Sequence, residues 1–147
     1  MRKLAKLLSL SVIERRLFLR AVFIVVCLRF KLRFLPFEKL KGALSKPKFR
    51  FALSKSFRSC SLDQIVRNVK RVVRFIPGKD TCLVRAMAAQ ILCLEEGYPV
   101  RFHIGVSKDE RDLFKAHAWV ENEGHVLIGE EDRSFYQPLF TARAEGS

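Results

Sequence analysis

Acidic residues are scarce in the first half of this chain. Residues 1–74 contain 20 Lys and Arg but only three acids, a net charge of 20 − 3 = +17. Residues 75–147 contain 8 basic and 12 acidic residues, a net charge of 8 − 12 = −4, and the whole chain carries +13. We therefore expect two regions with different roles: a basic, mostly helical region over 1–58 and a core over 59–147 that holds any chemistry.

Long apolar runs and targeting signals are also missing. The uninterrupted apolar stretch in the first predicted helix, residues 21–28, is eight residues long, whereas a helix needs roughly 20 to cross a bilayer. No small-residue cleavage site follows the basic start, so the sequence predicts neither a transmembrane segment nor a secretory signal. We expect a cytoplasmic protein of 147 residues, one domain with a helical appendage.

Metal-binding patterns are absent as well. The four cysteines, Cys27, Cys60, Cys82 and Cys93, include no Cys-x-x-Cys pair, and the three histidines do not complete a zinc pattern. We expect no metal, no cofactor and free thiols in a reducing compartment, although an oxidising one would allow two bridges.

Apolar periodicity and capping residues predict three main helices and three strands. The first helix covers residues 10–33, with Ser11 and Glu14 as a capping box, and a short helix and loop follow over 38–58. The second helix starts at Ser61, and the third covers 82–96, between a cap at Thr81 or Asp80 and Gly97. Alternating patterns predict strands over 99–107, 113–121 and 125–128, with a hairpin turn at 122–124.

Cys82 is the candidate nucleophile. A helix start favours a thiolate, because unpaired backbone N–H groups and the helix dipole stabilise negative charge. The same N–H groups can donate to a developing oxyanion. Cys93, by contrast, lies between Leu92 and Leu94 in mid-helix and is expected to be an inert core residue.

His117 is the candidate base, since a thiol that opens a helix followed by an imidazole on a strand suits acyl transfer. Trp119 shares its strand face, while His103 and His125 are expected to be structural or solvated. A carboxylate or amide usually orients such a histidine. Glu130 is our choice for that role, with Glu131 and Asp132 as alternatives beyond the third strand.

Several motifs carry a family resemblance. They are Cys82-Leu83-Val84-Arg85-Ala86, Gly97, Gly105-Val106, Ala116-His117-Ala118-Trp119-Val120-Glu121, Gly124 and Phe135-Tyr136-Gln137-Pro138-Leu139, with Glu14-Arg15-Arg16 and Leu35-Pro36-Phe37 in the front part. With these motifs the chain resembles the transglutaminase-like proteases that mature lasso peptides, the B-proteins of lasso-peptide gene clusters. The resemblance implies an α+β fold with a transglutaminase-like, papain-like core, in which a Cys helix packs on a small antiparallel sheet behind a basic helical N-terminal region.

The resemblance also implies a function. Such proteins remove the leader from a ribosomally made precursor peptide, and the chain is similar to the cutting half of the split form. The implied partners are the precursor leader peptide, a small leader-recognition protein and, as a further candidate, the macrolactam-forming cyclase. Cys82 carries over as nucleophile and His117 as base. The family often places an aspartate about a dozen residues after the histidine, and that position falls near Gly129 in this sequence.

Two other classes of function compete with the peptidase. The chain could bind and present peptides without cutting them. The basic segment 38–58, with Phe49, Phe51 and Phe57, could bind nucleic acid or an anionic membrane. No recognised nucleic-acid motif is present, so we expect no nucleic-acid partner.

Overall fold

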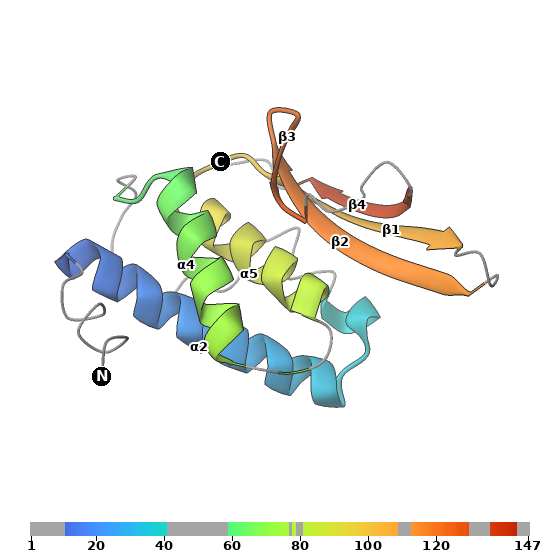
Figure 1. The fold of residues 1–147 in the computed structure, drawn as a ribbon, viewed down its shortest axis with the longest axis horizontal. Coiled ribbons are helices and arrows are strands. Elements are labelled where there is room, and N and C mark those ends of the chain that lie inside the picture. Colours follow the sequence, from blue (N-terminus) through green and yellow to red (C-terminus); the bar gives the residue numbers. More distant parts are fainter. Residues whose placement is uncertain are drawn as a thin grey trace.

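The computed structural model describes residues 11–40, 59–76, 78, 81–108, 113–129 and 136–143. The main elements of these residues are three helices, α2 (Val12–Phe34), α4 (Leu62–Phe75) and α5 (Thr81–Glu95), and four strands. The strands are β1 (Arg101–Lys108), β2 (Phe114–Asn122), β3 (His125–Ile128) and β4 (Gln137–Arg143). The helices gather on one side of the molecule and the sheet lies on the other (Figure 1). This is the expected α+β architecture.

Capping boxes set the starts of two helices. The Ser11 side chain accepts a hydrogen bond from the Glu14 backbone N–H at 3.2 Å, and Glu14 Oε2 accepts from the Ser11 backbone N–H at 3.1 Å. Ser61 and Gln64 make the same reciprocal pair ahead of α4. These bonds satisfy N–H groups that have no partner within the helix. Both helices therefore begin where the sequence predicts.

Helix α5 is the central element of the fold. It contacts α2 and α4, and it also contacts strands β2, β1 and β3. Its small residues Ala86, Ala88 and Ala89 are fully buried, which allows neighbouring elements to approach closely. The sheet residues of the same core are Phe102, Ala118, Val120, Ile128 and Ala142. The position of α5 ties the Cys82 helix to the sheet.

The sheet is antiparallel with the order β3-β2-β1-β4. The β2–β3 hairpin turns at Glu123 and Gly124, whose φ angles of 48° and 83° are both positive, as a type I′ turn requires. The three predicted strands are confirmed within two residues at each end. Strand β4, on the edge beside β1, is an addition that the sequence did not predict.

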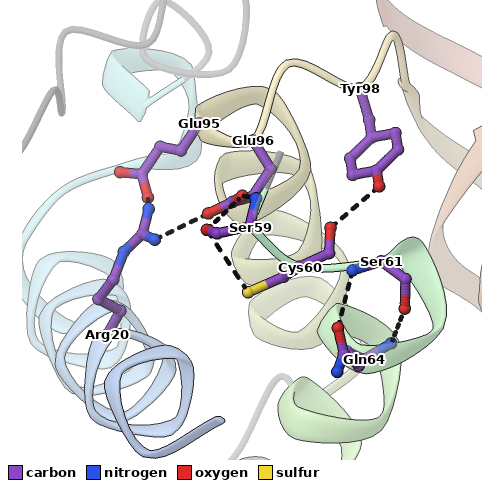
Figure 2. A network of polar contacts seen from close by, with 8 residues as sticks. All are labelled: Arg20, Ser59, Cys60, Ser61, Gln64, Glu95, Glu96 and Tyr98. Atoms are coloured by element: carbon purple, nitrogen blue, oxygen red, sulfur yellow. Dashed lines mark hydrogen bonds and ion pairs between the residues drawn. The ribbon is translucent and has the colours of Figure 1, made fainter. Parts of the chain in front are cut away.

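A polar network joins the end of α5 to the two other helices (Figure 2). The Arg20 guanidinium on α2 forms ion pairs with Glu95 and with Glu96, the latter at 3.0 Å. Glu96 also accepts hydrogen bonds from the backbone N–H and hydroxyl of Ser59, just before α4, at 2.9 and 3.0 Å. Tyr98 donates to the Cys60 carbonyl at 2.9 Å. These bonds fix the three helices relative to one another at the end of α5 away from Cys82.

Candidate active site

Cys82 is the second residue of α5, so its thiol lies in the first helical turn, as the sequence predicts. The backbone N–H groups of that turn have no acceptor within the helix. Cys82 is half-buried and its thiol is free, so a reagent or a substrate carbonyl can approach it. The position leaves the Cys82 thiol accessible, beside backbone N–H groups that have no acceptor within the helix.

Two other thiols lie in different surroundings. Cys93, on the same helix, is fully buried, and burial raises the pKa of its thiol to about 12. Burial also raises the pKa of Cys60. A buried thiol with a raised pKa is almost entirely protonated at neutral pH and is a poor nucleophile. The prediction that Cys93 is a core residue is therefore confirmed.

His117 lies near the middle of β2 and is only 9% exposed. Its Nε2 atom is 3.1 Å from the backbone carbonyl oxygen of Gly129. Gly129 directly follows β3, which pairs with β2, so the hairpin brings this carbonyl back to the histidine. The register of two neighbouring strands thus provides a fixed acceptor for the imidazole.

The Gly129 carbonyl determines which ring nitrogen of His117 carries the proton. A carbonyl can only accept, so Nε2 must be the N–H donor. The neutral imidazole then keeps its lone pair on Nδ1, and this nitrogen is the one able to take a proton. Among the described residues, Nδ1 makes no hydrogen bond. The geometry leaves a histidine with one nitrogen held and the other available.

The backbone at Gly129 admits no ordinary side chain. Its φ of +87° belongs to the left-handed region. A Cβ atom placed there would lie 2.6 Å from Cβ of Trp119 and 2.7 Å from the carbonyl oxygen of Ala118. Glycine is therefore required for the chain to pass this close to β2 and present its carbonyl to His117.

Aromatic rings surround His117 on its face of the sheet. Its ring centre is 5.1 Å from that of Tyr136 and 6.3 Å from that of Trp119. Gly105 on β1 pairs with His117, and a Cβ there would lie 2.8–2.9 Å from Tyr136 and the Trp119 ring. The missing side chain at Gly105 makes room for these two rings, which restrict the orientation of the imidazole.

His103 belongs to the same face but is held differently. Its ring stacks on Trp119 with centres 5.2 Å apart, and Nδ1 is 2.9 Å from the Thr141 hydroxyl. Glu121 accepts a hydrogen bond from the Trp119 indole N–H at 3.1 Å, and its other oxygen is 3.4 Å from His103 Nε2. These contacts are in line with the structural alternative of the expectation that His103 is structural or solvated. His103 and Glu121 both contact Trp119. The cluster was not predicted from the sequence, although it could have been found by aligning the predicted strands β1 and β2, because His103 and Trp119 are directly paired.

Helix α5 packs against β2, but the β2 residues in the core shared with α5 are Ala118 and Val120. His117 therefore lies on the strand that contacts the Cys82 helix, but on the opposite face of that strand. Among the described residues, no hydrogen bond joins the Cys82 thiol to His117. Catalytic hydrogen bonds are often long before substrate binds and tighten in the complex. The third predicted residue, Glu130, lies outside the described residues, as do its alternatives Glu131 and Asp132.

Within the described ranges, no three His, Cys, Asp or Glu side chains are grouped closely enough to hold a metal ion. In the same part of the chain, no helix combines the length and apolarity that crossing a membrane requires.

Comparison with known protein families identifies a superfamily that the chain matches. A family model described as the transglutaminase-like superfamily matches residues 24–141. The match begins within α2 and ends within β4, and it covers α4, the Cys82 helix and strands β1 to β3 in full. No curated protein and no solved structure matches the chain.

Proposed function

The chain belongs to the transglutaminase-like superfamily, and on this basis we propose that it is a cysteine peptidase acting on the leader of a ribosomally synthesised lasso-peptide precursor. Cys82 is the nucleophile and His117 the general base. The superfamily match supports cysteine chemistry, and the resemblance of the Cys82 and His117 motifs to lasso-peptide B-proteins supports the substrate.

The observation that carries the proposal is the hydrogen bond from His117 Nε2 to the Gly129 carbonyl. It fixes the tautomer with a lone pair on Nδ1, which is the form that a general base needs. Helix α5, which carries the thiol, contacts β2, which carries the base.

The reaction follows from these roles. His117 Nδ1 takes the Cys82 proton, and the thiolate attacks the carbonyl at the junction between leader and core peptide. The N–H groups of the first turn of α5 donate to the oxyanion of the tetrahedral intermediate. The intermediate collapses to a thioester with Cys82 as His117 protonates the departing core amine. Water, deprotonated by His117, then hydrolyses the thioester and releases the leader and the free thiol.

The third catalytic role has two candidates. In our proposal the group that orients His117 is either the Gly129 carbonyl or the carboxylate of Glu130, the residue chosen from the sequence. A neutral carbonyl stabilises imidazolium less than a carboxylate would. If the carbonyl is the orienting group, Glu130→Ala will reduce kcat less than about tenfold. If the Glu130 carboxylate is essential, the loss will be about 10²-fold or more, as for other members of catalytic triads.

The proposed partners are the precursor leader peptide, a small leader-recognition protein and the cyclase that closes the macrolactam. The experiment is mass spectrometry of a precursor peptide incubated with the full chain and its recognition protein. Cys82→Ala should abolish a single cut at the leader–core junction. The matched control is Cys27→Ala, which removes another half-buried free thiol and should leave the cut unchanged. An intact precursor with the native chain, or equal cutting by Cys82→Ala, would refute the proposal.

The second candidate is a module that binds and presents the precursor without cutting it. The absence of a thiol–imidazole hydrogen bond among the described residues favours this alternative. The two functions differ in one result: a presenting module binds the leader equally well in the native and Cys82→Ala forms and releases no product in either.

A further inference from the structure

Helix α2 has two apolar faces, and only one of them is used by the core. Its buried residues are Leu17, Ala21, Ile24, Val25 and Leu28. A second set of large apolar residues is exposed by 47–69%: Val12, Ile13, Leu19, Phe23, Val26, Phe30 and Phe34. A surface helix normally turns charged and polar residues to solvent. The second set therefore requires its own explanation.

The exposed residues form a continuous stripe. Leu19, Phe23, Val26 and Phe30 follow one another at intervals of four, three and four residues, which places them along one line of an α-helix. Phe34 continues the line, and its ring centre is 4.9 Å from that of Phe30. At 100° per residue this line is opposite the residues buried against the core. We call these five residues the outer stripe.

Positive charge borders the outer stripe. Arg15, Arg16 and Arg33 fall within about 60° of its centre on the helical projection. The described residues 11–40 and 59–76 contain 11 Lys and Arg against three acids. A second copy of the chain would bring basic residues against basic residues, so self-association through this face is opposed by charge. Charge complementarity instead favours an occupant that offers both apolar groups and negative charge.

We propose that the outer stripe of α2 binds the surface of an anionic lipid bilayer. Apolar side chains between basic residues suit the boundary between acyl chains and anionic headgroups. Basic side chains near such a surface are attracted to its negative potential. The helix lies flat on the bilayer, with Phe30 and Phe34 inserted below the headgroups. This role is independent of the proposed peptidase activity.

Docking through this face leaves the candidate site accessible. The outer stripe is on the side of α2 opposite its contacts with α4 and α5. Helix α5 in turn separates α2 from the greater part of the sheet (Figure 1). The protein would therefore be held at a membrane surface with the Cys82 helix and the sheet turned away from the lipid.

The test is co-sedimentation of the full chain with vesicles containing about one-third phosphatidylglycerol in phosphatidylcholine, at low salt. The test variant is Phe30→Gln with Phe34→Gln, since glutamine keeps good helix propensity. The matched control is Phe114→Gln with Leu139→Gln, which removes two equally exposed apolar side chains from the sheet (72% and 69%). Circular dichroism establishes that each variant is folded.

We expect the native chain and the sheet variant to bind anionic vesicles, and the stripe variant to bind at least about tenfold more weakly. Vesicles of phosphatidylcholine alone should bind little. In a separate variant, Phe30→Trp, the indole emission should shift to the blue when anionic vesicles are added. Absence of native binding, equal binding by the stripe variant, or no shift for Phe30→Trp would each overturn the proposal.

Discussion

At the scale of single residues, the orientation of His117 depends on a backbone atom, the carbonyl oxygen of Gly129. His117 is held through Nε2 by the Gly129 carbonyl at 3.1 Å, and Gly129 is held in place by its close passage over Trp119. Among the described residues, the hydrogen-bond partner of this imidazole is a peptide group and not a side chain. Such a partner fixes the tautomer of the ring without adding a charge.

Gly129→Ala should therefore destabilise the protein more than a matched change at Gly124. Both glycines have positive φ angles, 87° and 83°. A Cβ at Gly124 meets nothing within 4 Å, whereas one at Gly129 lies 2.6 Å from Trp119 Cβ. We expect Gly124→Ala to cost about 1 kcal/mol from backbone strain alone. Gly129→Ala should cost about 1–3 kcal/mol more because of the clash. If chemical denaturation gives the same loss of unfolding free energy for both variants, the contact of Gly129 with Trp119 does not restrict residue 129.

The sequence was sufficient to select Cys82, but it could not reveal the hydrogen-bond acceptor of His117. Cys82 could be singled out because a cysteine at a helix start has a chemical meaning, and the helix begins one residue before it. The acceptor of His117 could not be singled out, because every residue has a backbone carbonyl. Only the β2–β3 register shows which carbonyl reaches the imidazole.

At the scale of elements, local side-chain bonds fix the helix starts. Ser61→Ala should lower the free energy of unfolding by about 1 kcal/mol, because it removes the hydrogen bond to the Gln64 backbone N–H. Ser61→Asp keeps an acceptor at the same position and should retain most of the stability. Urea titration of the three proteins measures both effects. A loss in Ser61→Asp as large as that in Ser61→Ala would mean that the cap does not stabilise α4.

The elements predicted from the sequence are those specified by local signals. Ser11, Ser61 and the turn at Glu123-Gly124 mark their own boundaries through capping and backbone conformation. Strand β4 contains Pro138, which lacks an N–H and argues against a strand. The segment is nevertheless a strand because it pairs with β1 at the edge of the sheet. The pairing register shifts between Ile104 and Gly105. Pairing across more than 30 residues leaves no local signal.

At the scale of the whole molecule, residues from both ends of the sequence share one core. Leu17 and Ala21 of α2 and Ala118 and Val120 of β2 belong to the same buried cluster. The polar network of Arg20, Glu95, Glu96 and Ser59 reinforces this packing at its edge (Figure 2). Because charge composition contains no information on distant contacts, it could not predict how the basic helix packs.

This network should make stability depend on pH. Burial raises the pKa of Glu95 above its ordinary value of 4.5, even though Arg20 beside it acts in the opposite direction. A carboxyl whose pKa is raised by folding favours the folded state fully below its unfolded pKa. That contribution is lost as the pH rises through the folded pKa. The free energy of unfolding of the native chain, measured relative to that of Glu95→Gln, should therefore fall as the pH rises above 4.5. Parallel stability curves in urea denaturation across this range would contradict the assignment.

The central claim is that Cys82 and His117 act as one chemical unit, and thiol alkylation tests it without a substrate. Iodoacetamide is added to the native chain and to His117→Ala at slightly acidic pH, and peptide mapping gives the rate at each cysteine. Two other cysteines serve as controls. Cys27 is half-buried and lies on α2, and Cys93 is fully buried, with the pKa of its thiol raised to about 12. We predict that Cys82 reacts fastest in the native chain and at least about tenfold more slowly in His117→Ala, with Cys27 unchanged and Cys93 unreactive. A Cys82 rate that equals that of Cys27, or that does not change in His117→Ala, would contradict the account.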